Sequence, residues 1–217
     1  AILFLCRKAL KDQNNNYFHL ISGQDFPTKS VDYYLNSNEN FLQFEPLPTV
    51  NWNGNGGLNR YNYYNIFDCI SLKNKSRLFK LNNGFIKIQK LLKISRKSLN
   101  EDFKTIYGGG TWWSLTREAV EYVALNKNSD IYLKRMRYCF CSEEIYFQSI
   151  LLNSNLKQTI QNNNLRYIDW HSKRGGIPSF LDQTDFDEIV TNDYLFARKL
   201  NDKSSEQLKR MLINKNK

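Results

Sequence analysis

Apolar residues recur with helical spacing in four parts of the chain. In the opening segment AILFLCRKALKD they lie three to four positions apart, and the polar run DQNNN follows them. Thr116 and Ser142 each precede another such segment, with acidic residues in its first turn. Asp185 begins a fourth. The pattern therefore predicts helices at residues 1–12, after Thr116, at residues 142–152 and after Asp185.

Short apolar runs between these segments are typical of strands. They occupy residues 17–21, 40–45 and 165–170. Ser30 can begin a helix between the first two runs, and a helix between strands implies a crossover connection. We therefore expect an α/β fold in which helices flank a mixed central sheet.

Two loops carry candidate chemistry. Residues 22–27 directly follow the first strand, and ligands in open α/β sheets bind beyond the carboxyl ends of strands, so Asp25 is a candidate cleft residue. The alternative is a turn in which Asp25 caps its own backbone. The loop at residues 46–59 is long and rich in glycine, and we expect a flexible lid or an acceptor loop there.

Three consecutive glycines precede a pair of tryptophans. Glycine allows positive φ or a close approach between the backbone and a ligand, which makes Gly108, Gly109 and Gly110 candidates for lining a cleft. Trp112 and Trp113 are candidates for the same cleft. Because neighbours on a strand face opposite ways, at least one of the two is expected in the core.

Length and composition fit one folded domain. The chain has 217 residues, 41% of them hydrophobic, which is enough for one substantial core. It begins with Ala in a segment that already has a helical pattern, so we expect a piece of a longer protein. No apolar run approaches the roughly 20 residues of a membrane span. The four cysteines lack paired metal spacing, which favours buried thiols in a reducing compartment over a disulfide or a metal site.

The net charge of +10 favours an anionic partner. Basic residues concentrate at residues 73–97, where no acid occurs and apolar residues are interleaved. This pattern is typical of a solvated face on a core helix, and also of a contact with a membrane surface. Both interpretations stay open for this segment.

Five segments occur in a recognisable order along nearly the whole chain: YFHLISGQDFPTKS, YGGGTWWSLTREAVEYV, SEEIYFQSILLNS, LRYIDW and DYLFARKL. Together they resemble the core-2/I-branching N-acetylglucosaminyltransferase family, which includes the peptide O-xylosyltransferases, and the chain looks like a bacterial-type member. The resemblance implies a GT-A-like fold and an inverting, metal-independent transfer of a sugar from a UDP-sugar to an acceptor hydroxyl. Family members begin with strands that hold the nucleotide base. The resemblance thus implies one glycosyltransferase domain at residues 1–217 that lacks those strands.

The resemblance also implies roles for single residues. Glu144 falls on the catalytic glutamate of the family, and Glu143 falls on the acid before it. Lys199 falls on the lysine that neutralises the donor diphosphate, and Arg174 aligns with the arginine that accompanies it, in a loop shorter than that of the animal enzymes. A base and a cationic group are what a single displacement at an anomeric carbon requires.

Other positions match less closely. Glu45 and Arg60 match acceptor-side positions only loosely. Residues 185–187 read Asp-Phe-Asp, which is the form of a metal-binding motif in many GT-A enzymes. We interpret them instead as the first turn of a helix with Thr184 as its N-cap, and we expect no metal site.

Two functions stay open at this level. The first is a cytoplasmic glycosyltransferase that uses no cofactor. It takes GlcNAc or xylose from a UDP-sugar and transfers it to a glycan or lipid-linked saccharide. It binds no nucleic acid and contacts the membrane through residues 73–97. The second is a non-catalytic basic module that binds nucleic acid or an anionic membrane surface. The second function does not account for the glycine run, the tryptophan pair or the loop at residues 22–27. The acceptor, the linkage and the uridine-binding residues do not follow from the sequence.

Overall fold

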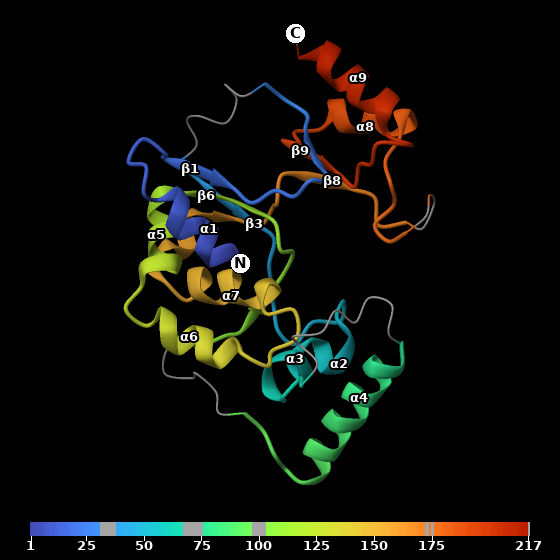
Figure 1. Ribbon diagram of the computed structural model, residues 1–217. Helices are drawn as coiled ribbons and strands as arrows, with labels where there is room; N and C mark the ends of the chain where they lie inside the picture. The colour runs from blue at the N-terminus through green and yellow to red at the C-terminus, as the bar shows by residue number, and fades with distance from the viewer. Residues whose placement is uncertain (31–37, 67–75, 97–102, 172–173, 175, 217) are drawn as a thin grey trace.

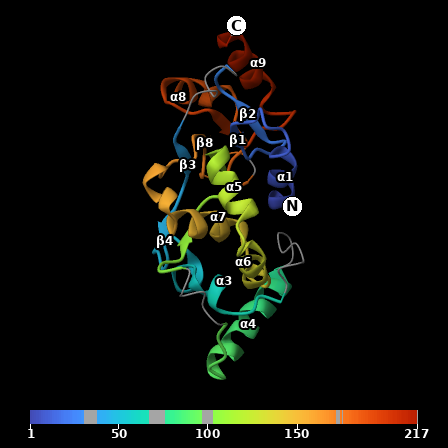
Figure 2. The same cartoon turned by 90° about the vertical axis from the view of Figure 1, so that its left-hand side faces the viewer.

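A computed structural model describes residues 1–217 except 31–37, 67–75, 97–102, 172–173, 175 and 217. The helix expected after Ser30 falls on residues outside this description. The first and last helices of the described chain lie far apart, and α4 lies at the end opposite the C-terminus (Figures 1 and 2). None of the described helices is both long enough and apolar enough to cross a membrane.

The strands form two mixed sheets and one separate pair. The larger sheet has the order β1 (Tyr17–His19), β6 (Trp113–Thr116), β3 (Asn40–Leu42) and β7 (Ile160–Gln161). The smaller sheet has the order β2 (Asp25–Pro27), β9 (Phe196–Arg198) and β8 (Arg166–Ile168), and β4 (Glu45–Pro46) pairs with β5 (Tyr107–Gly108). Each sheet combines antiparallel pairs with one parallel pair, β3 with β7 and β8 with β9. The expected mixed α/β architecture is confirmed.

The helices gather at three places in the molecule (Figure 1). Beside the larger sheet lie α1 (Ile2–Ala9), α5 (Arg117–Leu125), α6 (Ser129–Met136) and α7 (Glu143–Leu152), followed by η2 (Asn155–Thr159). Beside the smaller sheet lie η3 (Gln183–Asp185), α8 (Phe186–Thr191) and α9 (Glu206–Lys215). At the opposite end lie α2 (Asn53–Gly56), α3 (Leu58–Asn62) and α4 (Ser76–Leu91). The two sheets therefore have separate clusters of buried side chains, and the cluster around α7 is the larger.

Helix α5 forms for the reasons its sequence indicates. The Thr116 hydroxyl accepts a hydrogen bond from the backbone N–H of Ala119 at 3.3 Å, as expected of an N-cap. Ala119, Val120, Val123 and Ala124 form its apolar face and are fully buried, and Glu118 occupies the first turn. This prediction is confirmed.

Helix α7 begins and ends where predicted, but its surroundings differ from the expectation. Ser142 occupies the N-cap position without a capping hydrogen bond from its side chain. Every residue at 145–152 is buried, so α7 has no solvent-facing side beyond its first turn. Within the core, Asn153 donates to the carbonyl of Thr105 at 2.7 Å. Only the end that carries the two glutamates reaches the surface.

Three predicted elements differ in extent. The loop expected at residues 22–27 contains strand β2 at its end, because Asp25–Pro27 pairs with Phe196–Arg198. The helix expected after Asp185 ends at Thr191, and the segment that follows it forms β9. The loop expected at residues 46–59 contains the short helix α2 and the start of α3.

Candidate active site

The glycine run lies along α7 and is bound to its first two turns. The Gly109 N–H donates a hydrogen bond to the carbonyl of Glu144 at 2.9 Å. The side-chain amide of Gln148, which is fully buried, donates to the carbonyl of Gly110 at 2.8 Å. These bonds place the glycine run directly beside the glutamate that the sequence marks as the base.

The glycines are required by packing within the protein. A Cβ on Gly109 would lie 1.9 Å from the carbonyl oxygen of Gln43, and one on Gly108 would lie 2.7 Å from the Trp52 ring. Neither glycine has positive φ. Protein atoms thus occupy the space on the Cβ side of Gly108 and Gly109, and a role of these glycines in a cleft stays a prediction. Gly110 is less confined, since a Cβ there would lie 3.2 Å from its nearest atom.

Glu144 forms an ion pair with Arg60 that joins α7 to α3. The Arg60 Nη1 lies 2.6 Å from the Glu144 Oε2, and the two side chains are 25% and 30% exposed. Burial raises the pKa of Glu144 above its usual value, while the positive charge and hydrogen bond of Arg60 act in the opposite direction. Such a carboxylate has the environment of a general base, because it is partly desolvated and still in contact with solvent.

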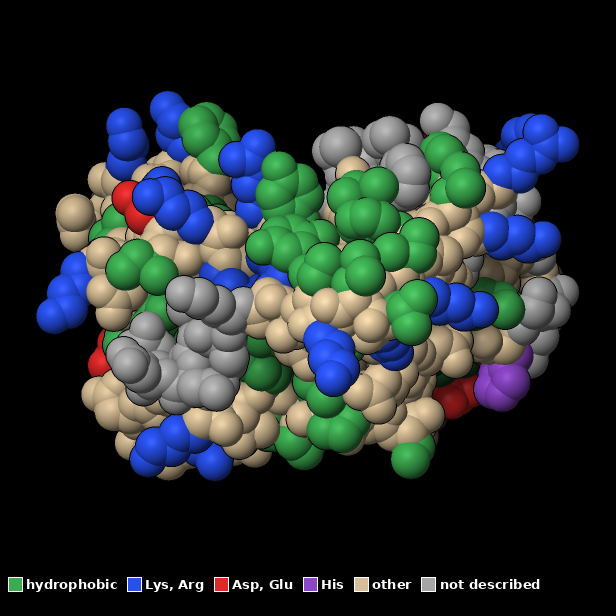
Figure 3. Space-filling view, turned by 90° about the horizontal axis from the view of Figure 1, so that it is seen from below, with side chains coloured by type: hydrophobic (Ala, Val, Ile, Leu, Met, Phe, Trp, Pro, Cys, Tyr) green, Lys and Arg blue, Asp and Glu red, His purple; other side chains and the backbone are tan. Residues whose placement is uncertain are grey.

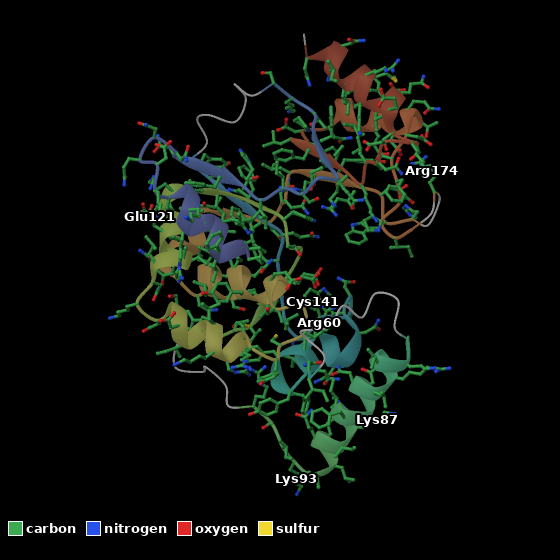
Figure 4. The ribbon with its side chains drawn as sticks, viewed as in Figure 1. Arg60, Lys87, Lys93, Glu121, Cys141 and Arg174 are labelled. Atoms are coloured by element: carbon green, nitrogen blue, oxygen red, sulfur yellow. The ribbon has the colours of Figure 1, made fainter. Side chains whose placement is uncertain are left out.

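Trp52 organises this region, and the sequence interpretation did not single it out. The Arg60 guanidinium lies 4.2 Å from the centroid of the Trp52 ring, and a Cβ on Gly108 would lie 2.7 Å from the same ring. The Arg60 guanidinium also lies 5.6 Å from the centroid of the Phe140 ring, in the segment before α7, and Arg60 is labelled just below Cys141 in the view of Figure 4. An aromatic residue inside a glycine-rich loop, eight positions before an arginine, is the signal that could have found it.

Glu45 lies next to the glycine run through backbone pairing. It is opposite Gly108 in the β4–β5 pair. Its carboxylate accepts hydrogen bonds from the Thr49 hydroxyl and, at 3.0 Å, from the Asn51 amide. The structure thus brings Glu45, Arg60 and Glu144 to one place, although their roles toward an acceptor stay predictions.

Asp25 belongs to a second cluster, on the smaller sheet. Its fully buried carboxylate accepts from the backbone N–H of Ser22 at 2.7 Å, and it lies 3.2 Å from Arg198 and 3.7 Å from Arg166. The bond to Ser22 agrees with the alternative interpretation as a turn cap. The candidate role of Asp25 in a ligand cleft stays a prediction.

The two tryptophans after the glycine run separate as neighbours on a strand should. Trp113 is buried and packs against Phe147, with ring centroids 5.2 Å apart. Trp112 faces the second cluster, where the Arg198 guanidinium lies 4.1 Å from its ring centroid. The core role expected for one of the pair is confirmed for Trp113. Trp112 links the glycine run to the cluster around Asp25.

The two cations expected at the donor diphosphate approach the same residue. The Arg174 Nε donates to the carbonyl of Phe180 at 2.7 Å, and the Lys199 Nζ lies 4.6 Å from the centroid of the Phe180 ring. The rest of the Arg174 guanidinium is engaged by Asp182 at 3.2 Å and Asp185 at 2.5 Å. Lys199 has no carboxylate within ion-pair distance in the described part of the chain. Its ammonium is therefore the more available of the two.

The Asp-Phe-Asp sequence at residues 185–187 spans the end of η3 and the start of α8. Asp182 is the N-cap of η3, and Asp185 completes a capping box by accepting from the Asp182 N–H at 2.9 Å. The expected N-cap at Thr184 is therefore wrong, because Asp182 takes that position two residues earlier. Over the described ranges, no three His, Cys, Asp or Glu side chains are placed to hold a metal ion. Metal independence itself stays a prediction.

Residues 1–193 match the Core-2/I-branching enzyme family. The chain belongs to this family. This confirms the family resemblance, of whose five segments the first four lie within the matched range, and identifies the mixed α/β architecture as GT-A-like.

Named relatives match shorter parts of the chain. Human xylosyltransferase 2 is 36% identical over 70 residues, which are 31% of this chain and 8% of that protein. Xylosyltransferase 1 of Rattus norvegicus is 37% identical over 71 residues, with the same two shares. A β-glucuronosyltransferase of Arabidopsis thaliana is 30% identical over 107 residues, 48% of this chain and 24% of that protein. The matched segments thus span less than a quarter of each relative.

Proposed function

We propose that this protein is an inverting glycosyltransferase in which Glu144 is the general base. The observation that carries the proposal is the Glu144–Arg60 ion pair, 2.6 Å long, at a helix start bound to the glycine run. Membership of the Core-2/I-branching family and the similarity to xylosyl- and glucuronosyltransferases support the reaction class. The proposed donor is a UDP-sugar, and the proposed acceptor is a glycan or lipid-linked saccharide.

The reaction is a single displacement. Glu144 accepts the proton of the acceptor hydroxyl, whose oxygen forms the new bond to the anomeric carbon as the bond to the UDP oxygen breaks. The leaving diphosphate gains negative charge, and a cation nearby stabilises it. We assign this role mainly to Lys199, because Arg174 already pairs with Asp182 and Asp185. Arg174 contributes only if it exchanges one of these aspartates for the diphosphate.

The donor sugar is tested with a panel of UDP-sugars that includes xylose, N-acetylglucosamine and glucuronate. UDP release by the full-length protein is measured with mixed glycan acceptors, and Glu144→Gln is the inactive control. We expect acceptor-dependent release with one donor, unchanged by EDTA. Absence of release with every donor contradicts the transferase proposal. Release that EDTA abolishes and Mn²⁺ restores contradicts the role given to Lys199.

We also propose that α4 contacts an anionic membrane surface, which would place the enzyme at the cytoplasmic face of a membrane. Exposed apolar side chains on α4 and directly after it are Leu81, Ile88, Leu91, Leu92 and Ile94. Seen from below, hydrophobic side chains gather in the middle of the molecule, and Lys and Arg side chains lie around them (Figure 3). A basic helix with an exposed apolar side is the arrangement that binds at a lipid interface. This combination favours a lipid over a nucleic acid as the anionic partner.

A further inference from the structure

A groove lies between α4 and the segment that carries α2 and α3. Its volume is about 800 Å³, within the range of small-molecule sites. Arg60 and Phe140 line it at the side nearest α7, and Lys80, Lys87 and Lys90 line it along α4. Because Arg60 also pairs with Glu144, the groove leads to the candidate base.

The groove is built on the inner framework of α4. Asn82 donates to the Asn65 side chain at 3.0 Å, and Gln89 exchanges hydrogen bonds with the backbone of Tyr64 at 2.9 and 3.0 Å. Asn82 and Gln89 are buried, so they attach α4 to the chain that follows α3. The attachment holds the lysine-bearing side of α4 toward Arg60.

Helix geometry separates this side of α4 from its apolar side. At about 100° per residue, Lys80, Lys87 and Lys90 fall on one side of the buried positions, and Leu81 and Ile88 fall on the other. Figure 4 shows Lys87 on α4 and Lys93 beyond its far end. The three groove lysines are exposed, and no acidic residue is among the described residues that line the groove.

We infer that this groove binds the acceptor saccharide and selects one that carries a negative charge, a sugar carboxylate or a phosphate. The inference rests on the proposed function, because it makes the groove the acceptor side of the same site. Charges of one sign along a cleft concentrate their field there and attract a ligand of opposite sign. Side-chain amides both donate and accept hydrogen bonds, as sugar hydroxyls do, and Asn53 and Asn83 add such groups to the walls. An acidic peptide would satisfy the lysines and leave these amides without hydroxyl partners.

The test measures equilibrium binding to the full-length protein without any donor. The probes are a short oligosaccharide of alternating N-acetylglucosamine and glucuronate, its carboxyl-reduced neutral form, the neutral form with a terminal phosphate, and an acidic peptide. The variants are Lys80→Gln/Lys87→Gln/Lys90→Gln and the control Lys93→Gln, whose lysine is exposed outside the groove. Since all four lysines are exposed, the variants should fold as the parent does, which circular dichroism checks.

We expect a charged oligosaccharide to bind at least about tenfold more tightly than the neutral form at 0.1 M salt, with the advantage shrinking as salt rises. The triple variant should lose most of this advantage, and Lys93→Gln should change it less than twofold. Preference for the glucuronate or for the phosphate probe identifies the charged group. Equal binding of charged and neutral probes, an unchanged triple variant or tighter binding of the peptide overturns the inference.

These outcomes are separable from failure of the proposed function. Lysine-dependent binding of the charged probe in a protein that transfers no sugar contradicts the transferase proposal and leaves the groove assignment standing. Transfer to neutral and charged acceptors at equal rates, unaffected by the triple variant, contradicts the groove assignment and leaves the transferase proposal standing.

Discussion

The carboxylate of Glu144 is subject to two opposing influences. Burial favours its neutral form, and Arg60 at 2.6 Å favours its charged form. A general base must lose its proton before it can accept one from the acceptor, so the ion pair keeps Glu144 in the form that reacts. Glu143, the next residue, shares the helix start but points about 100° away around the helix axis.

The two glutamates should therefore respond differently to neutralisation. Glu144→Gln should lower kcat by roughly 10²–10⁴-fold, the usual worth of a positioned base, with UDP affinity nearly unchanged. Glu143→Gln is the matched control, since each change costs only a few tenths of a kcal/mol at the helix terminus. Initial rates and UDP titrations on both variants test this. Equal and modest losses would mean that neither carboxylate is the base.

Removal of Arg60 should move the pH dependence of the reaction. Without its charge, burial and the neighbouring Glu143 charge act on Glu144 unopposed, so the pKa rises further above the ordinary value of 4.5. In Arg60→Met the rising acid limb of the kcat/KM profile should lie at higher pH than in the parent, whatever happens to KM. Arg210→Met, which changes an exposed side chain of α9, should leave the limb in place. An unshifted limb in Arg60→Met would contradict the assignment of Glu144 as the titrating base.

The raised pKa of Glu144 also makes the stability of the fold depend on pH. A carboxyl whose pKa is raised in the folded state binds its proton more tightly there than in the unfolded chain. Glu144 therefore favours folding at pH below 4.5, and this contribution is lost as the pH rises through the raised pKa.

At the scale of elements, α7 and the glycine run act as one unit. Gly109 and Gly110 are bound to Glu144 and Gln148, and Gln43 packs on the other side of Gly109. A methyl group at Gly109 has no space, because the atom it would meet is backbone.

Alanine substitutions at Gly109 and Gly110 should differ in their effect on stability, because only Gly109 lies directly against backbone atoms. Gly109→Ala should destabilise the protein by about 1–3 kcal/mol, the typical cost of overpacking, and should lower kcat by displacing the Glu144 helix start. Gly110→Ala is the control, because its nearest atoms belong to side chains. Thermal unfolding and initial rates measure both. Similar stability of the two variants would show that β4 and β5 separate easily at this point.

The sequence predicts elements well where local signals decide them. Thr116 and the 3.6-residue pattern after it were sufficient for α5, because that helix has one buried face. The pattern could not assign a cleft face to α7, since residues 145–152 are buried on all sides. The N-cap at Asp182 was missed because Thr184 is also a good cap residue, and the ion pair with Arg174 lies outside any local pattern.

The candidate site was also only partly predictable from the sequence. Glu144, Lys199 and the glycine run followed from family motifs, but the close contact between Gly109 and Gln43 depends on a long-range approach of two strands. Trp52 belongs to no motif, and the groove lysines were visible only as part of the basic segment at residues 73–97. Their arrangement around Arg60 appears only in the fold. Arg174 aligned with a diphosphate ligand in sequence, and its aspartate partners became visible only in the fold.

At the scale of the molecule, α4 should decide membrane association. Substitution of Leu81, Ile88 and Leu91 by Ser removes exposed apolar area, which should lower binding to anionic vesicles at least about tenfold, since each apolar side chain contributes to interfacial affinity. Co-sedimentation with vesicles that contain phosphatidylglycerol, compared with purely zwitterionic vesicles, measures it. Ile213→Ser, on exposed α9, is the control. Retained binding in the triple variant would rule out α4 as the contact.

The hydrogen bonds between the glycine run and α7 have a consequence for redesign of the enzyme. They fasten the base to the core, whereas the groove lysines stand on α4, none of whose described residues belongs to the larger buried cluster. The chemistry and the choice of acceptor are thus carried by different parts of the chain. Exchange of α4 between family members should change which acceptor is glycosylated while the Arg60–Glu144 pair and the catalytic turn keep their geometry.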